Sequence, residues 1–242
     1  MRRRIAAIVS LALLPPLVGV VGALKRQDSQ AERYENERLA MVRQIEQYGV
    51  RDSATLAAMR SVPRHDFVPR EQRRRAYGDH PLPIGYGQTI SQPYIVAYMT
   101  EILEPEPAMK ILEVGTGSGY QAAVLADIGC AVYTIEIFEA LADSARLRLR
   151  RLGYDNVLVR HADGHYGWEE AAPFDAVIVT AAAGFIPPAL VDQLKPGGRM
   201  VIPVGSVYGV QNLIFLEKDT SGDVRTRNLL PVRFVPMLKG LR

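Results

Sequence analysis

The stretch GQTISQP, residues 87–93, places the hydroxyl of Ser91 in a short polar segment between Gly87 and Pro93. Such a hydroxyl could attack a substrate, cap the helix that follows, or hold a bound anion. A serine nucleophile needs a base within reach, and this segment lacks the G-x-S-x-G pattern of a nucleophile elbow. The four histidines, at 65, 80, 161 and 165, lie in other segments and show no acid–histidine pairing. The residues therefore favour a hydrogen-bonding role, with a helix cap as the open alternative.

A glycine-rich segment, LEVGTGSGY, supplies a second candidate site, with Gly115, Gly117 and Gly119 spaced G-x-G-x-G. A dinucleotide fingerprint requires Gly or Ala one position later, where Tyr120 stands. Glu113 precedes the first glycine. A carboxylate there disfavours a phosphate, but it suits a cation such as an ammonium or a sulfonium.

Two further carboxylates follow the next two predicted strands. Glu136 ends TIEI, nineteen residues past Gly117, and can accept hydrogen bonds from both ribose hydroxyls of an adenosine. Asp163, in HADG, can accept from an adenine amino group. Taken singly, a glycine can serve packing and Glu136 can be a solvated strand end. Together, the loop and the three acids predict an S-adenosylmethionine site of the class I methyltransferase kind.

The elements that must position these residues alternate between strand and helix from residue 94 onward. Near-continuous apolar strands are predicted at 109–115, 131–137, 156–163, 174–182 and 200–205, with KPGGR at 195–199 as a turn. Helices are predicted at 94–103, 120–128, 140–153 and 187–194. This pattern is typical of an α/β doubly wound, mostly parallel, Rossmann-like sheet covered on both faces. Residues 211–219 and 224–237 predict a C-terminal antiparallel hairpin added to that sheet.

The region before the sheet predicts a helical N-terminal cap. Leu39, Val42, Ile45 and Tyr48 form an apolar stripe on a helix that runs from Ser29 to Gly49. A second helix, 53–61, can be capped by Asp52 or Ser53, and residues 62–93 predict a long functional loop. The expected organisation is an apolar segment at 1–24, the helical cap at 25–75 and the methyltransferase domain at 76–242.

Several stretches resemble the protein-L-isoaspartate O-methyltransferases: VPRHDFVP, LPIGYGQTISQPYIVAYMTEIL, ILEVGTGSGYQAAVLA, GWEEAAPFDAVIVTAAA, LKPGGRMVIPVG and VRFVPM. The resemblance runs from about Met41 to Met237. GQTISQP and VRFVP are its specific parts, since other class I methyltransferases lack them. The chain departs from the family at Ala162-Asp163-Gly164, where Gly-Asp-Gly is usual, and in its apolar N-terminal extension.

The resemblance implies methyl transfer from S-adenosylmethionine to the free α-carboxylate of L-isoaspartyl residues in damaged proteins and peptides. The ester then recyclises to a succinimide, which begins repair. The family's active-site serine falls on Ser91, and its peptide-binding edge falls on VRFVPM with Val235. Gln88 and Thr89, on the same loop as Ser91, are expected to line the cleft between cofactor and peptide, so the expected substrate-binding residues are Gln88, Thr89, Ser91 and Val235. The expected cofactor-binding residues are Glu113, Gly115, Thr116, Gly117, Ser118, Gly119, Glu136, Ile137, Asp163 and Gly164. Two alternatives stay open: another class I carboxyl methyltransferase acting on a small molecule, and a non-catalytic cofactor-binding protein of the same fold.

The N-terminal residues suggest where in the cell the protein works. Arg2, Arg3 and Arg4 precede an apolar run from Ile5 to Leu24, which matches a secretory signal and is also about as long as a membrane span. Pro15 and Pro16 weaken a straight transmembrane helix. The segment 1–24 is therefore signal-like, anchor-like or vestigial, and only residues 5–24 are expected to touch a membrane. Because the cofactor is made and kept in the cytosol, we expect a cytoplasmic monomer, with export or membrane anchoring as the alternative.

Charge, cysteine and histidine content argue against a nucleic-acid-binding, disulfide-linked or metal-binding protein. Residues 1–75 carry 15 Lys/Arg and 8 Asp/Glu, whereas residues 76–242 carry 14 and 18. The body therefore lacks the basic footprint of a nucleic-acid-binding protein. Cys130 is the single cysteine and lies in an apolar run, which predicts core packing rather than a disulfide. No histidine has metal-ligand spacing, so no metal is expected.

Overall fold

The computed structural model of the protein describes residues 17–240. The strands are β1 (Leu82–Gly85), β2 (Gln88–Ile90), β3 (Lys110–Val114), β4 (Ala131–Glu136), β5 (Val157–His161), β6 (Phe174–Val179), β7 (Leu194–Gly205), β8 (Gln211–Lys218) and β9 (Val224–Val232). The helices are α1 (Leu17–Gln47), α2 (Ser53–Ser61), α3 (Pro93–Leu103), α4 (Tyr120–Asp127), α5 (Glu139–Arg151) and α6 (Pro188–Asp192). Short 3-10 helices are η1 (Arg64–Phe67), η2 (Arg70–Arg75), η3 (Gly164–Tyr166) and η4 (Glu169–Ala171).

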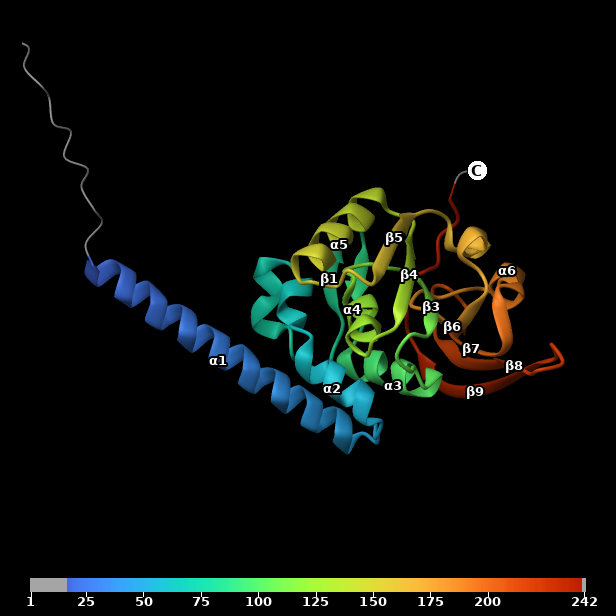
Figure 1. Ribbon diagram of the computed structural model, residues 1–242, viewed down its shortest axis with the longest axis horizontal. Coiled ribbons are helices and arrows are strands. Elements are labelled where there is room, and N and C mark those ends of the chain that lie inside the picture. The colour runs from blue at the N-terminus through green and yellow to red at the C-terminus, as the bar shows by residue number, and fades with distance from the viewer. Residues whose placement is uncertain (1–16, 241–242) are drawn as a thin grey trace, which may run out of the picture. The chain divides into compact units, whose positions relative to one another are not determined.

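Seven strands form one sheet in the order β5-β4-β3-β6-β7-β8-β9 (Figure 1). The pairs from β5 to β7 are parallel, and the pairs β7–β8 and β8–β9 are antiparallel. The chain moves outward from β3 to β5 and then returns to β6 on the other side of β3. This reversal of strand order is the switch point at which doubly wound sheets bind ligands. The predicted doubly wound sheet with a C-terminal hairpin is confirmed.

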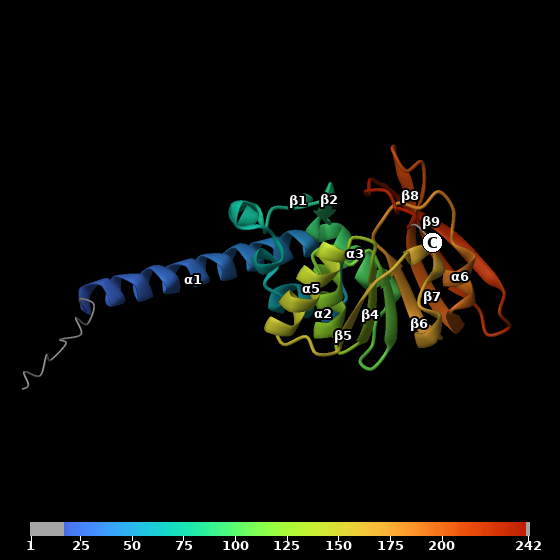
Figure 2. The ribbon, with the colours of Figure 1, turned by 90° about the horizontal axis from the view of Figure 1, so that it is seen from above.

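Helices cover both faces of the sheet, as Figure 2 shows from above. Neighbouring residues of β3 point to opposite faces: Ile111 packs with α3 and α4, whereas Leu112 packs with the group that contains Leu190 of α6. All three side chains are fully buried, which stabilises the fold by roughly 1.5–3 kcal/mol for each such residue. Cys130 is buried in the same cluster as Ile111, as predicted.

The chain divides after Glu37 into two compact units. In the first unit, ion pairing of Arg33 with Glu37 links successive turns of α1. In the second unit, Val42 and Ile45 are buried as predicted, but Tyr48 lies beyond the helix end and is 51% exposed. Helix α1 begins at Leu17 rather than Ser29.

The predicted apolar segment 1–24 falls partly outside the described residues, which begin at residue 17. Within residues 17–240, none of the helices combines the length and the hydropathy that a membrane span requires.

Two local predictions were wrong. The stretch 62–93, predicted as one long loop, instead contains η1, η2 and the β1–β2 hairpin, in which Gly85, Tyr86 and Gly87 all have positive φ. The segment 195–199 is not a separate turn. It belongs to β7 and forms a bulge there, since the register with β6 shifts between the pairs Phe174–Leu194 and Ala176–Arg199.

Candidate functional site

The glycine loop follows β3 at the switch point, directly beside the end of β6. Gly115 has φ +103°, and a Cβ there would lie 2.5 Å from Thr180 Oγ1. The Thr180 hydroxyl donates to the Gly115 carbonyl oxygen at 2.6 Å. A side chain at residue 115 is therefore excluded by both backbone conformation and space. Glycine at this position therefore lets the loop pack directly against Thr180 at the end of β6.

Glu113 is buried below this loop with one oxygen unpaired. Its Oε2 accepts a hydrogen bond from Thr134 Oγ1 at 2.5 Å, whereas Oε1 has no partner among the described residues. Burial raises the pKa of Glu113 to about 8, so the carboxyl is largely protonated at neutral pH. Glu113 lines a cavity of about 50 Å³. A cation in that cavity would give Oε1 a partner and would favour the ionised form.

Glu136 faces the same cavity from the end of β4. Its Oε2 accepts from the Gly117 N–H at 2.7 Å, and its Oε1 accepts from the Phe138 N–H at 3.0 Å. Each carboxylate oxygen has two acceptor sites, so both can still accept from a ligand hydroxyl. The structure therefore brings Glu113, Glu136 and the glycine loop together around one cavity.

Asp163 lies near this site but is absent from the residues that line the cavity. Its Oδ1 accepts from the His165 N–H at 2.9 Å, and its Oδ2 accepts from the Gly240 N–H at 2.8 Å. Burial opposes ionisation of Asp163, but these hydrogen bonds outweigh it and hold the pKa below its usual range. Ile137 also lies beside Gly240. The C-terminal segment therefore contacts Asp163, predicted for the adenine amino group, and Ile137, another predicted cofactor-binding residue.

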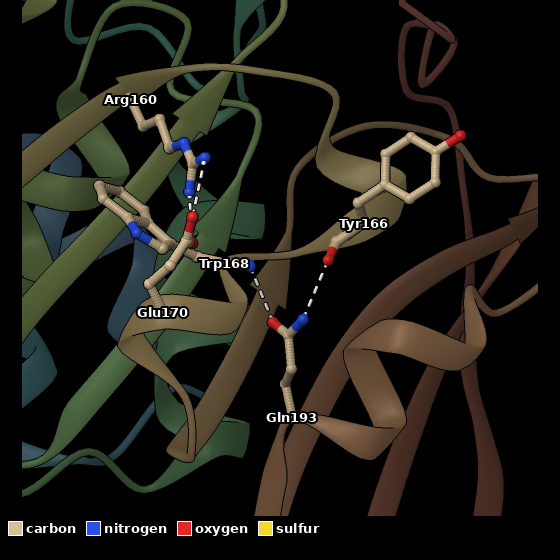
Figure 3. A network of polar contacts seen from close by, with 5 residues as sticks. All are labelled: Arg160, Tyr166, Trp168, Glu170 and Gln193. Atoms are coloured by element: carbon tan, nitrogen blue, oxygen red, sulfur yellow. Dashed lines mark hydrogen bonds and ion pairs between the residues drawn. The ribbon is translucent and has the colours of Figure 1, made fainter. Parts of the chain in front are cut away.

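The segment after β5 that carries Asp163 is fixed by a polar network (Figure 3). Gln193 accepts from the Trp168 N–H at 2.8 Å and donates to the Tyr166 carbonyl oxygen at 2.9 Å. Arg160 pairs with Glu170 and lies over the Trp168 ring. These contacts hold Trp168 as a structural part of the segment. Gly164 is equally constrained, since a Cβ there would lie 2.3 Å from the Cγ1 of Val114, the last residue of β3.

The hydroxyl groups of the glycine loop support the loop itself. Thr116 Oγ1 and Thr134 Oγ1 are 2.7 Å apart and continue the buried chain to Glu113. Ser118 Oγ accepts from the Tyr120 N–H at the start of α4. The Ser118 carbonyl oxygen accepts from Arg148 on α5 at 2.8 Å. These two loop residues line the cavity, but their side chains are already engaged within the protein.

Ser91 follows β2 and lies between two cavities. The smaller cavity is the one that Glu113 and Glu136 line, and the larger has a volume of about 410 Å³. Four residues line both of them: Thr89, Ser91, Thr180 and Val235. Gln88 lines only the smaller cavity. Three of the four predicted substrate residues therefore form the wall shared by the two cavities.

The helix-cap alternative for Ser91 is not supported. The N-cap of α3 is Gln92, and the Tyr94 N–H of its first turn donates to Asp79 Oδ1 at 2.9 Å. A nucleophilic role also lacks its partner, because no histidine is among the residues that line either cavity. His165 pairs with Asp163, whereas His65 contacts the Tyr77 hydroxyl as a structural residue. Ser91 therefore lines both cavities, and a hydrogen-bonding role stays the prediction for its hydroxyl.

Thr180 is a site residue that the sequence reasoning missed. It directly follows β6, whose end lies beside the end of β3. The signal was present, since Thr180 is the first polar residue after the apolar run AVIV. The same strand-end reasoning that found Glu136 would have found it. Val235 is held beside it, because its carbonyl oxygen accepts from the Ala182 N–H at 2.8 Å.

The fold and the site together define the class. A solved structure named protein-L-isoaspartate O-methyltransferase matches with a TM-score of 0.76 and 28% identity, over 82% of this chain and 65% of that chain. The beta-aspartate methyltransferase (PCMT) from Plasmodium falciparum, in complex with S-adenosyl-L-homocysteine, matches with a TM-score of 0.71 and 25% identity, over 83% and 98% of the two chains. The chain therefore has a class I, Rossmann-like methyltransferase fold.

Sequence relatives narrow this class to one family. The family model described as Protein-L-isoaspartate(D-aspartate) O-methyltransferase (PCMT) matches residues 36–242. Protein-L-isoaspartate O-methyltransferase 2 of Syntrophobacter fumaroxidans is 54% identical over 97% of each chain. The protein of the same name from Polaromonas sp. is 62% identical over 77% of this chain and 88% of its own length. The chain belongs to the protein-L-isoaspartate(D-aspartate) O-methyltransferase family.

Proposed function

We propose that this enzyme transfers a methyl group from S-adenosylmethionine to the free α-carboxylate of L-isoaspartyl residues in proteins and peptides. Family membership supports the reaction. The observation that carries the proposal is the shared wall between the two cavities, which Thr89, Ser91, Thr180 and Val235 form. A wall lined from both sides is where a donor group and an acceptor group can meet.

The smaller cavity is the proposed cofactor side. Glu113 would face a cationic group of the cofactor through its unpaired Oε1, Glu136 would accept from the ribose hydroxyls, and Gly115 to Ser118 would lie against the ligand. Gly119, which packs against Leu149 of α5, would support the loop from behind. Ile137, Asp163 and Gly164 would form the adenine end. S-adenosylmethionine supplies a methyl group made electrophilic by its sulfonium centre.

The cofactor side must open when a ligand enters. Ligand pockets in proteins usually exceed about 300 Å³. The present cavity of about 50 Å³ is bounded by Gln88, Thr89 and Ile90 of β2. Ile84 of β1 lies 3.3 Å from the Cβ position of Gly117. Outward displacement of the β1–β2 hairpin is therefore part of the proposed function.

The larger cavity would hold the isoaspartyl residue. An α-carboxyl group has a reference pKa of roughly 3.5 and is ionised at neutral pH, so the reaction needs no general base. The protein has to remove water from the carboxylate and aim one oxygen at the methyl carbon. Ser91 would donate to the other oxygen and so keep the attacking oxygen aimed at the methyl carbon. Orientation of this kind can lower a barrier by roughly 7–11 kcal/mol.

The test is methyl transfer from labelled S-adenosylmethionine to an isoaspartyl peptide, beside the same peptide with normal aspartate. Base-labile label on the isoaspartyl peptide alone is expected. Label on both peptides or on neither would contradict the proposal. Ser91→Ala should lower turnover at least about 10-fold with unchanged S-adenosylhomocysteine affinity, because a hydrogen bond to a charged group is worth roughly 1.5–3 kcal/mol. Ser206→Ala, on the exposed β7–β8 turn, is the matched control, and full turnover of Ser91→Ala would refute the anchoring role.

We also propose that the enzyme works in the cytoplasm, since the cofactor is made and kept in the cytosol, and that it works as a monomer. The organisation into a segment 1–24, a helical cap 25–75 and a catalytic domain 76–242 is part of the same proposal. Cell fractionation with N-terminal sequencing of the mature protein tests the location. A chain cleaved near residue 24 and recovered outside the cytoplasm would overturn it, and light scattering of the purified protein tests the monomer.

A further inference from the structure

Arg64 is a buried cation that the proposed reaction does not use. It is the first residue of η1, and its side chain is completely buried. Among residues 29–240 it is the only Lys or Arg in the buried class. Burying a charge costs several kcal/mol unless its partners compensate for the lost water. Burial lowers the pKa of Arg64 to about 10, so it remains a cation at neutral pH.

The Arg64 guanidinium joins three segments that are distant in the sequence. Its Nε donates to the Ala76 carbonyl oxygen at 2.8 Å. Its Nη2 donates to the Ser91 carbonyl oxygen at 2.7 Å. Its Cζ lies 4.8 Å from the centre of the Tyr120 ring, a cation–π contact. The planar guanidinium is suited to this combination, because it donates in its plane while its face stacks on a ring.

These contacts link the two sides of the proposed site. Ser91 belongs to the wall shared by both cavities, whereas Tyr120 begins α4 directly after the glycine loop. Arg64 itself lines neither cavity. The residues after Ser91 are held by Asp79, which accepts from Gln92 Nε2 at 2.8 Å and from the Tyr94 N–H at 2.9 Å. Arg64 therefore fixes the carbonyl of Ser91, and Asp79 fixes the start of the helix that follows it.

We propose that Arg64 is a positioning residue for methyl transfer, which holds Ser91 at a fixed place relative to the start of α4 and the glycine loop. This inference rests on the proposed function. Its physical basis is that an in-line displacement tolerates little error in orientation. A misplacement of roughly 1 Å can cost about 100-fold in rate. The buried arginine is retained because it sets this alignment.

The test compares Arg64→Lys and Arg64→Gln with wild type. A lysine keeps the charge but cannot donate to Ala76 and Ser91 while stacking on Tyr120. The glutamine keeps one donor without burying a mismatched cation, so it is the variant to use if lysine impairs folding. Both should lower kcat with the isoaspartyl peptide about 10- to 100-fold. We expect KM to change less than about 3-fold and the S-adenosylhomocysteine Kd, from calorimetry, less than about 2-fold, since Arg64 touches neither ligand.

A double-mutant cycle with Ser91→Ala separates positioning from general destabilisation. If Arg64 acts through the Ser91 hydroxyl, the double variant is no slower than Ser91→Ala alone. Additive losses would overturn the proposal, and so would a loss of kcat matched by an equal loss of cofactor affinity. Leu190→Ala in α6 is the destabilised control, and it should lower the melting temperature without this pattern. Arg60→Lys, on the exposed side of α2, controls for the substitution itself.

The proposed function and this inference fail in different ways. If wild type does not label the isoaspartyl peptide, the proposed function is wrong. If wild type labels the peptide and Arg64→Lys turns over at the same rate, only the positioning role is wrong.

Discussion

Replacement of Glu113 by glutamine should remove a pH dependence from the stability of this protein. Burial raises the pKa of Glu113 to about 8, from an ordinary value of 4.5 that the unfolded chain would show. Between these values the folded protein keeps a proton that the unfolded chain releases. Stability rises with pH only where the unfolded state binds more protons, and here it binds fewer. The contribution of Glu113 is therefore fully present below about pH 4.5 and is lost as the pH rises toward 8.

The size of this change in the free energy of unfolding follows from the single proton that Glu113 keeps in the folded state. A difference of one bound proton changes the free energy of unfolding by about 1.4 kcal/mol for each pH unit. From about pH 5.5 to about pH 7.5 the wild type should lose roughly 3 kcal/mol of stability through Glu113. Glutamine is neutral and nearly isosteric, and its side-chain oxygen can still accept from Thr134. We expect Glu113→Gln to lie within about 1 kcal/mol of wild type at the lower pH and to exceed it at the higher pH.

Urea unfolding at the two pH values measures this difference directly. The quantity to compare is the change in free energy of unfolding between them, wild type against variant, because other titrating groups then cancel. Glu71→Gln, at an exposed position of η2, is the matched control and should keep the wild-type slope. An identical pH dependence for Glu113→Gln and wild type would refute the reasoning. It would mean that Glu113 is ionised in the folded protein despite its burial.

Three other substitutions test the supporting geometry. Asp52→Ala removes the acceptor of the Thr55 N–H at the start of α2 and should cost about 1 kcal/mol in urea unfolding; an unchanged midpoint would deny the cap. Glu136→Ala should weaken S-adenosylhomocysteine binding about 10-fold or more in calorimetry, since it removes acceptors for two hydroxyl donors, and unchanged affinity would exclude the ribose role. Gly164→Ala places a Cβ 2.3 Å from Val114 Cγ1 and should cost roughly 1–3 kcal/mol, whereas wild-type stability would show that β3 can move aside.

The parallel part of the sheet could be predicted because its central strands, β3, β4 and β6, are largely apolar runs with no competing period. The β1–β2 hairpin could not, because its strands are short and its turn depends on positive φ at three successive residues, 85 to 87. One of these is Tyr86, which seldom adopts that conformation and gives no sign of it in sequence. The bulge in β7 escaped prediction for a related reason. KPGGR has the composition of a turn, and only pairing with β6 makes it part of a strand.

The part of the candidate site that could be predicted consists of polar residues at the ends of strands. Glu113, Glu136 and the glycine loop occupy such ends, and the structure places them around one cavity. Spacing alone could not show that Asp163 is already hydrogen-bonded to the Gly240 N–H, because that contact joins residues far apart in the chain. Nor could it show that Ser91 belongs to a wall between two cavities. Both facts depend on tertiary packing, which no local pattern records.

Arg64 could not be identified as a site residue from the sequence, but its burial in the structure identifies it. In the sequence it is one of many arginines, and PRHDF does not mark it as interior. In the described side chains of residues 29–240, the charged groups in the buried class are Arg64, Glu113 and Glu136. Glu113 and Glu136 line the smaller cavity, and Arg64 binds the backbone of Ser91. Because burying a charge opposes folding, such residues persist where another requirement outweighs that cost. Here two of these ionisable residues line the smaller cavity and the third binds a residue of its wall, so the burial of ionisable side chains points to the candidate active site independently of the motifs.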